Sequence, residues 1–589
     1  MNSKKSMLAK GISIGAAIAL LLTGCGSGST SGSTASTTKE SSAPSAAAQD
    51  ISFPLKEKAT LTAFVMTPYS GENADYTNNY VTDYLETKEN LKIDFKYTGT
   101  GDDGKTKLNL LMASGDTLPD IFLATKWSKA ETMLYGKQGL VIPLNSYLKN
   151  APNWNELNKL SPMRLGDITM PDGNIYCYGD DNECMHCMFQ SRMWIYKPWV
   201  DKLANGKMPA TTDELYTFLK AVKEKDPNGN SKKDEIPLTG NIAAGGWATD
   251  PTTFIINAFI QNNNILSNTN PVVGAGFVVN DKKVEFQFIK DGYKKAMVYL
   301  NKLYKEGLLD SQSFTQNADQ QKATVQGTPQ LAAMAPGGWW ACNTDELLME
   351  KPGPYQDWTA LEPVKGPDGV QLAAYYPTNY YQSCYGLVSA DCKNPELAVK
   401  FFDLMGSEEM TLISQCGPKG LGWDYVTEGT SISGGKATWK KIPAPKYNSS
   451  NMPDYSSVGL NFVKYVWDPD AVMTHNTSDF RLGQFCENPE TNVEGLLYKY
   501  GKAYSKYKPD DSTMLPNLAY SEEDAKKIAD YSVSIGKFVN QSTVQFITGD
   551  LDINKDWQSY IDKINGMDLT GYLSIQQKAY DGYVSGLNK

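Results

Sequence analysis

The chain has 589 residues, of which 66 are Asp or Glu, 56 are Lys or Arg and two are His, so its formal net charge at pH 7 is −10. This excess of acid argues against nucleic acid and other polyanions as partners. Arginine occurs only at positions 164, 192 and 481, and so few bidentate guanidinium groups favour a largely neutral ligand. Aromatic residues make up 11% of the chain, including 34 Tyr and 12 Trp, which leaves flat side chains available for stacking.

The first 50 residues have the pattern of an export signal followed by a tether. Lys4, Lys5 and Lys10 precede an apolar run at residues 11–22, which is shorter than the roughly 20 residues of a membrane-spanning helix. The run ends in LTGC at residues 22–25, which resembles the bacterial lipobox. We therefore expect residues 1–24 to be a signal peptide and Cys25 to carry diacylglycerol with acyl chains such as palmitate, although a plain secretory signal with an incidental Cys25 is the alternative. Residues 25–50, rich in Gly, Ser, Thr and Ala, predict a flexible linker that holds the protein at the extracellular face of the cell membrane.

The segment after the tether alternates between strand and helix patterns. A strand is predicted at 60–66, a helix at 80–89, a strand with a period of two at 91–97, a helix at 105–114 and a short strand at 120–124. This alternation is typical of an open α/β lobe. About 540 residues exceed a single compact core, so two lobes are expected.

Further helices are predicted along the middle of the chain. Thr211 and Glu214 indicate a capping box that starts a helix with an apolar face over residues 215–222. Apolar residues recur at helical spacing over 293–304, and Asn394 and Pro395 start a helix that ends near residue 406. Residues 427–453 are rich in Gly and Pro and predict mostly irregular connection.

The loop at residues 226–235, DPNGNSKKDE, carries the sharpest chemistry in the sequence. Calcium takes six to eight hard oxygen ligands, and alternate positions of such a loop turn their oxygens inward, as in an EF-hand. The loop departs from that pattern in having Ser231 where glycine is usual and its last acid at position 10. A polar Asn-Gly turn is the alternative to a structural calcium site. The expected ligands, with Lys232 through its backbone carbonyl, are Asp226, Asn228, Asn230, Lys232, Asp234 and Glu235.

Eight cysteines remain if Cys25 is lipidated, and their spacing does not settle which of them pair. One CxxC occurs at Cys184 and Cys187, with His186 between them. This cluster could be a metal or redox centre, or it could have a structural role. A second pair at zinc-finger spacing is missing from the sequence, which disfavours zinc.

Residues 114–121 (SGDTLPDI), 192–203 (RMWIYKPWVDKL), 211–219, 226–238 and 557–583 together resemble the family 1 extracellular solute-binding proteins. The similar branch is that of lipoproteins related to alginate-oligosaccharide-binding proteins. The resemblance implies an α/β, periplasmic-binding-protein-like fold of two lobes, each an open sheet flanked by helices, joined by hinge strands around a ligand cleft. It implies an N-terminal lobe of residues 51–187 and 385–430 and a C-terminal lobe of residues 188–384 and 431–589. It also implies a non-enzymatic monomer that captures an extracellular oligosaccharide and delivers it to the permease subunits of an ABC transporter in the membrane.

A sugar ring has an apolar face and a rim of hydroxyl groups, so its receptor needs flat aromatic side chains and polar groups around them. We expect at least three of Trp247, Trp339, Trp340, Tyr376, Tyr380 and Trp423 to line the cleft, while packing inside a lobe is the alternative for each. The full set of expected ligand-binding residues is Trp247, Trp339, Trp340, Tyr375, Tyr376, Asn379, Tyr380, Trp423, Glu72, Asp120 and Arg192.

Two other classes of protein fit an exported, aromatic-rich chain. A glycan-active enzyme would need two carboxylates across the scissile bond, which 66 acids supply by chance. The one GxSxG match, at residues 11–15, lies in the expected signal peptide, and only two histidines could act as general bases. A surface adhesin or sensor lipoprotein is the second alternative.

Overall fold

The computed structural model describes residues 51–587 except 68–75, 78, 162, 244–245, 264, 266–275, 339–353, 379–384, 445, 448–452, 455, 459–466 and 468–474. Among the predicted site residues, Cys25, Glu72, Trp339, Trp340, Asn379 and Tyr380 lie outside the described residues. The described helices include none that is both long enough and apolar enough to cross a membrane.

The first hydrophobic core surrounds a four-stranded sheet in the order β10-β3-β1-β2. Its strands are β1 (Ala59–Thr67), β2 (Leu91–Thr100), β3 (Ile121–Leu123) and β10 (Gly386–Val388). β1 pairs in parallel with β2 and β3, whereas β10 is antiparallel to β3. The predicted strands at 60–66, 91–97 and 120–124 correspond to β1, β2 and β3. Buried side chains alternate with more exposed ones in β2, whereas β3 and residues 63–66 of β1 are buried at every position.

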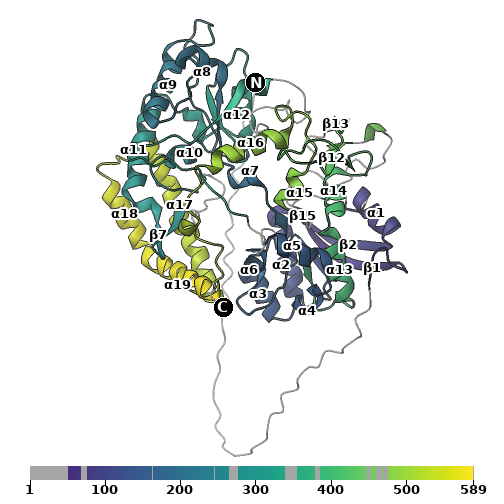
Figure 1. The fold of residues 1–589 in the computed structure, drawn as a ribbon. Coiled ribbons are helices and arrows are strands. Elements are labelled where there is room, and N and C mark those ends of the chain that lie inside the picture. Colours follow the sequence, from purple (N-terminus) through teal and green to yellow (C-terminus); the bar gives the residue numbers. More distant parts are fainter. Residues whose placement is uncertain are drawn as a thin grey trace, which may run out of the picture. The chain divides into compact units, whose positions relative to one another are not determined.

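Helices cover this sheet (Figure 1). α1 (Tyr80–Lys88) and α2 (Gly101–Ser114) contact β2, and α13 (Pro395–Met405) contacts β10. α13 begins as predicted, because the Asn394 side chain accepts a hydrogen bond from the Leu397 amide and Pro395 has no N–H that would need an acceptor. α3 (Lys129–Lys137), α4 (Asn145–Leu148), α5 (Pro152–Leu160), α6 (Met163–Ile168) and α14 (Glu408–Cys416) complete this part.

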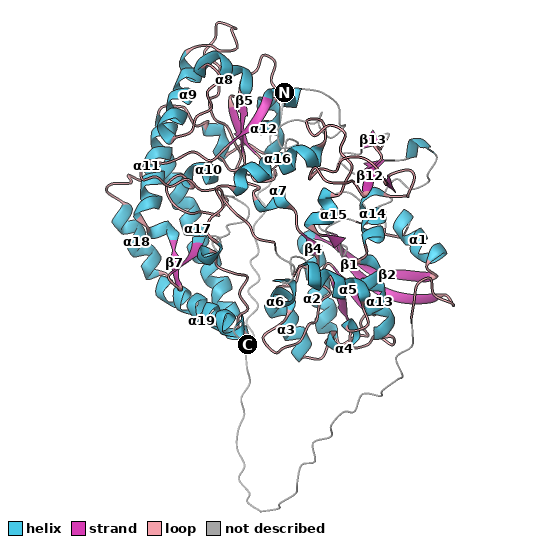
Figure 2. Ribbon diagram, in the orientation of Figure 1, coloured by secondary structure: helices cyan, strands magenta, loops and turns pink. Residues whose placement is uncertain are grey.

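The second hydrophobic core surrounds a three-stranded antiparallel sheet in the order β8-β5-β9. The strands are β5 (Met193–Tyr196), β8 (Met334–Pro336) and β9 (Trp358–Leu361). Helices dominate here, as Figure 2 shows. They include α8 (Lys197–Ala204), α9 (Thr212–Glu224), α11 (Asp291–Lys305), α16 (Val493–Ser505), α17 (Glu522–Thr548), α18 (Trp557–Gly566) and α19 (Leu569–Leu587), with α17 packed against α11 and α19.

The start of α9 confirms half of the predicted capping box. Thr211 Oγ1 accepts a hydrogen bond from the Glu214 amide at 3.2 Å. The Glu214 carboxylate, however, accepts from the amide of Ala210 at 2.8 Å. The acid therefore satisfies a backbone donor one residue before the cap.

The two cores give the expected two-lobed α/β architecture. Buried apolar residues from Leu61 to Tyr178 and from Tyr385 to Phe480 pack in the first core, and those from Phe189 to Ala373 and from Leu496 to Tyr572 pack in the second. The predicted lobe boundaries stay a prediction, although the chain changes core between Phe480 and Leu496, later than the expected crossing near residue 430. The irregular segment before it stays with the first core because large aromatic side chains, Trp439 and Trp467 among them, are buried there.

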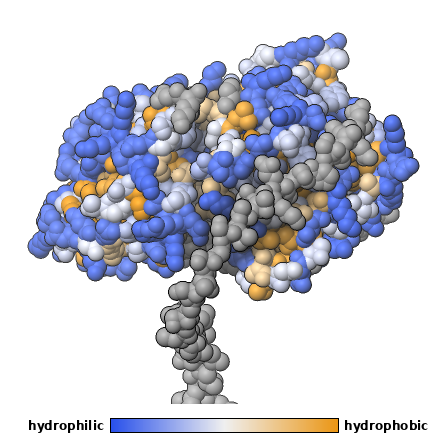
Figure 3. Space-filling model, turned by 90° about the horizontal axis from the view of Figure 1, so that it is seen from below, coloured by the Kyte–Doolittle hydropathy of each residue, from blue (hydrophilic) through white to orange (hydrophobic). Residues whose placement is uncertain are grey.

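Hydrophilic residues cover most of the face seen in Figure 3, and the hydrophobic residues on that face form small separate patches. Isolated apolar side chains of this kind are normal for a protein surface.

Candidate functional site at the first crossing

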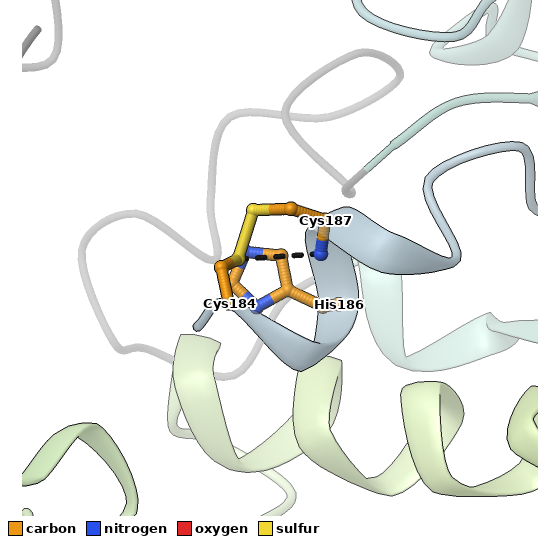
Figure 4. A group of neighbouring side chains, drawn as sticks. All are labelled: Cys184, His186 and Cys187. Carbon is orange, nitrogen blue, oxygen red and sulfur yellow. Dashed lines mark hydrogen bonds between the residues drawn. A yellow bond between two sulfur atoms is a disulfide. The ribbon is translucent and has the colours of Figure 1, made fainter. Parts of the chain in front are cut away.

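The chain passes from the first core to the second through a short helix closed by a disulfide. α7 (Met185–Met188) follows Cys184, whose sulfur accepts a hydrogen bond from the amide of Cys187 at 3.2 Å. The two cysteines are joined by an S–S bond of 2.00 Å (Figure 4). Metal coordination at a CxxC needs thiolates, so in this oxidised form the cluster is a structural staple. Four further cysteines are buried, namely Cys177, Cys392, Cys416 and Cys486. Cys342 and Cys384 lie outside the described residues.

His186 is buried between the disulfide and α16. Its side chain is close to the disulfide in Figure 4, and its Nδ1 lies 3.6 Å from an oxygen of Glu494. Burial lowers the pKa of His186 to about 3 despite the opposing effect of Glu494. The imidazole is therefore neutral at physiological pH.

Arg192, predicted to contact the ligand, is a buried backbone clamp. Its side chain is 0% exposed. One guanidinium nitrogen donates to the carbonyl of Gly338 and the other to the carbonyl of His186. Arg192 directly precedes β5, and its planar fork joins the segments of His186 and Gly338, which are distant in sequence. A contact of Arg192 with the ligand stays a prediction.

Trp247 lies against these segments as a partly buried side chain. Its indole N–H donates to the side-chain oxygen of Gln190, and the Gly338 amide donates to the Trp247 carbonyl at 2.7 Å. The His186 ring meets the indole edge-on, with ring centroids 6.0 Å apart. Gly338 directly precedes Trp339 and Trp340 in the sequence.

Tyr375 and Tyr376 approach the same crossing from the chain that leaves the second core. The Tyr376 hydroxyl lies 3.1 Å from the Ser191 hydroxyl, and the Tyr376 amide donates to the Met188 carbonyl. The Tyr375 ring packs near Phe189 and has the Lys508 ammonium 4.6 Å from its centroid. The first crossing thus brings together four parts of the chain, namely residues 186–192, 247, 337–338 and 375–376.

Two other predicted ligand residues lie with the first core: Trp423 is part of it, and Asp120 is hydrogen-bonded to β1 of its sheet. Trp423 is 0% exposed, and its indole donates to the Gly417 carbonyl at 2.9 Å. Asp120 accepts hydrogen bonds from the amide and hydroxyl of Thr62 at 2.8 and 2.6 Å. Asp120 also precedes β3, whereas ligands of open α/β sheets bind beyond the carboxyl ends of the strands. Both residues have hydrogen-bond partners within the protein, and their contact with a ligand stays a prediction.

Gln190 and Gly338 were missed by sequence reasoning. Gln190 is a polar residue with no motif around it, and its partner is 57 positions away. For Gly338 a signal existed, because a glycine pair directly before two tryptophans indicates close approach of the backbone to a bulky group.

The predicted calcium loop folds around its first acid. Asp226 Oδ1 accepts from the amides of Gly229 and Asn230 at 2.9 and 3.1 Å, and Oδ2 accepts from the amide of Ser231 at 2.9 Å. Ser231 has a φ of 61°, so it adopts the left-handed conformation for which an EF-hand uses glycine. The Asn230 side chain accepts from the amide of Lys232 at 2.8 Å.

Glu235 gives the strongest sign that this loop suits a cation. The residue is 9% exposed, and both of its carboxylate oxygens are buried without a hydrogen-bond partner among the described residues. Burial raises the pKa of the Glu235 carboxyl, and the neighbouring carboxylate of Asp226 raises it further. Two acids and several amide oxygens around one orphaned carboxylate form the hard-oxygen donor set that calcium prefers.

A cavity of about 420 Å³ within reach of this loop is lined by Lys223, Ile236, Tyr304 and Asp310. A cavity of about 530 Å³ lies elsewhere, with Lys129, Met170, Tyr520, Lys578 and Tyr583 in its walls. Neither cavity contains a predicted ligand residue in its walls.

The family of bacterial extracellular solute-binding proteins matches residues 70–411. The fructooligosaccharide ABC transporter substrate-binding protein FusA of Streptococcus pneumoniae is 26% identical over 555 residues, which are 93% of this chain and 95% of that protein. A solved structure of the S. pneumoniae FusA EF-hand mutant in complex with fructo-nystose is 22% identical, has a TM-score of 0.68 and matches 90% of this chain and 100% of that one. The alginate-binding protein AlgQ2, solved without calcium ion, is 22% identical with a TM-score of 0.61 and matches 90% and 99% of the two chains. The family match spans more than half of the sequence, and this chain belongs to the bacterial extracellular solute-binding proteins.

Proposed function

We propose that this protein is the substrate-binding lipoprotein of an ABC importer and captures an extracellular oligosaccharide between its two lobes. The observation that carries the proposal is the convergence of Trp247, Tyr375 and Tyr376 with the Gly337–Gly338 turn on the first crossing. Rings held at a junction between lobes suit the apolar faces of sugar rings, and nearby hydroxyl and amide groups suit their rims. Trp339, Trp340, Asn379 and Tyr380 follow these segments in sequence and extend the proposed site.

A fructooligosaccharide is the first ligand to test, because the relative that matches along 93% of the chain is named for that class of sugar. Isothermal titration calorimetry with kestose, maltotriose and an alginate trisaccharide compares a neutral fructan, a neutral glucan and an acidic sugar. We expect kestose to bind with micromolar affinity and the acidic sugar to bind least, since the chain carries a net charge of −10. Failure of every oligosaccharide to bind would refute the proposal.

Two tryptophan-to-alanine variants test where the sugar binds. Each buried stacked ring contributes roughly 1 to 3 kcal/mol, so Trp247→Ala and Trp340→Ala should each weaken binding at least tenfold with little change in melting temperature. Trp423→Phe is the matched control because its indole lies in the first core. An unchanged affinity in both alanine variants would place the sugar elsewhere.

A structural calcium ion is the second part of the proposal, supported by the orphaned Glu235 carboxylate. Asp226, Asn228, Asn230, Asp234 and Glu235 would hold it through side chains and Lys232 through its backbone carbonyl. The ion would pin the loop and take no part in capture. At a calcium concentration 100-fold above Kd the native state gains about 2.7 kcal/mol, so a chelator should lower the melting temperature before it abolishes sugar binding.

Glu235→Gln tests this site with a nearly isosteric change. We expect the calcium-dependent rise in melting temperature to fall sharply in Glu235→Gln and to persist in Glu224→Gln, whose acid is exposed at the end of α9. If the melting temperature of the wild-type protein does not change with calcium concentration, the proposed calcium site is refuted.

The anchor and partners complete the proposed function. Cys25 would carry the lipid that holds the monomeric protein at the extracellular face of the membrane, from which it delivers sugar to the permease subunits. Radiolabelled palmitate should enter the wild-type protein and not Cys25→Ala. Incubation with the bound oligosaccharide should release no new reducing ends, and compaction on sugar addition in small-angle scattering distinguishes capture from adhesion.

A further inference from the structure

The indole of Trp247 is held on more than one side by the segment that links the cores. Its N–H, the only hydrogen-bond donor of the ring, points to the side-chain oxygen of Gln190. Gln190 is itself partly buried, three residues after the disulfide-closed turn and two residues before Arg192. The neutral imidazole of His186 lies against the indole edge-on.

Gly338 forms a wall beside the same ring. A Cβ atom at this position would lie 2.4 Å from Cδ2 and 2.5 Å from Cε3 of Trp247, so the glycine backbone is already in close contact with the indole. Two further contacts fix the wall: the Gly338 amide donates to the Trp247 carbonyl, and the buried Arg192 guanidinium donates to the Gly338 carbonyl.

The hydrogen bond to Gln190 acts on how the indole turns about its side-chain bonds. The glycine wall limits one side of the ring, while the hydrogen bond to Gln190 selects the rotation at which Nε1 faces the crossing. A stacking residue works only when its plane is fixed before the ligand arrives, because ordering it on binding costs affinity.

We propose that Gln190 is a positioning residue for oligosaccharide recognition, which acts through the orientation of the Trp247 indole and not by contact with the sugar. This inference rests on the proposed function. The ligand class is a neutral oligosaccharide whose ring stacks on Trp247.

A double-mutant cycle with kestose as the probe separates action through Trp247 from direct contact. Phenylalanine keeps a flat ring but lacks the N–H donor, so Trp247→Phe removes the link to Gln190. We expect Gln190→Ala to raise the Kd about fivefold in the wild-type background and less than twofold in the Trp247→Phe background. Gln558→Ala, an exposed position on α18, is the control and should leave the Kd unchanged. Equal weakening by Gln190→Ala in both backgrounds would overturn the inference.

The indole N–H signal of Trp247 gives a readout that needs no ligand. In ¹H–¹⁵N spectra, with the signal identified by its loss in Trp247→Phe, Gln190→Ala should shift this resonance upfield and speed its exchange with water while the other indole signals stay in place. An unchanged Trp247 signal would overturn the inference whatever the sugar does. A signal that responds to Gln190→Ala in a protein that binds no sugar would support the positioning role and refute the proposed function, so the two failures are distinguishable.

Discussion

Replacing Gly338 with alanine perturbs the wall beside Trp247 by a single methyl group. The new Cβ would lie 2.4, 2.5 and 2.9 Å from Cδ2, Cε3 and Cε2 of the indole, whereas ordinary van der Waals contacts fall at 3.4 to 4 Å. The ring must therefore move by about 1 Å, and overpacking of this kind costs typically 1 to 3 kcal/mol where nothing yields. Because Trp247 is partly exposed, the indole can yield, and the cost should appear mainly in ligand affinity.

The expected result for Gly338→Ala is at least a tenfold rise in the Kd for kestose, equivalent to about 1.4 kcal/mol, with a small fall in melting temperature. Calorimetric titration and thermal unfolding measure the two quantities. Gly566→Ala, where a Cβ would meet nothing within 4 Å at the end of α18, is the matched control and should change neither. A Gly338→Ala protein with wild-type affinity would show that the indole does not need this wall to bind sugar.

Three further predictions concern stability. Ser231→Gly should stabilise the apo protein by about 0.5 kcal/mol, because Ser231 has a φ of 61° that glycine adopts without strain. Gly229→Ala, at a φ of 73° with open space around it, should destabilise the protein. Urea unfolding in the presence of a chelator compares the two variants. Burial raises the pKa of Asp181 to about 8, so the native state holds a proton that the unfolded chain loses near pH 4. The free energy of unfolding should therefore fall as the pH rises from 4 to 8, and Asp181→Asn should reduce this pH dependence. An unchanged pH dependence in Asp181→Asn would assign it to other groups. Reduction of Cys184–Cys187 should cost about 2 kcal/mol because the bond closes a very short loop, and a much larger loss would mean that α7 unfolds with it.

Local features followed from the sequence because their causes lie within a few residues. The period of two over residues 91–97 places alternate side chains of β2 on the core, and Thr211 caps α9 by accepting from an amide three residues ahead. In the loop predicted to hold calcium, the amides that Asp226 accepts from lie three to five residues after it, so the turn around this acid is also a local feature.

The candidate ligand site was harder to predict, as Arg192 and Trp423 show. Both residues have side chains that recognise sugars, and both lie beside glycine-rich or family-like segments, yet each is 0% exposed. The sequence does not state which side of a strand or loop turns inward when its neighbours come from elsewhere in the chain. Arg192 is buried because Gly338, 146 positions away, supplies a carbonyl for its guanidinium.

By itself, then, the sequence determined the periodic elements and the helix caps, because short-range hydrogen bonding and side-chain periodicity act over one or two turns of chain. The export signal and the calcium site stay predictions. Tertiary structure decided the third crossing between the cores, the pairing of Cys184 with Cys187 and the contact of Gln190 with Trp247. These depend on which distant segments become neighbours, and that choice is made by burial of the whole apolar surface of each lobe rather than by any local pattern.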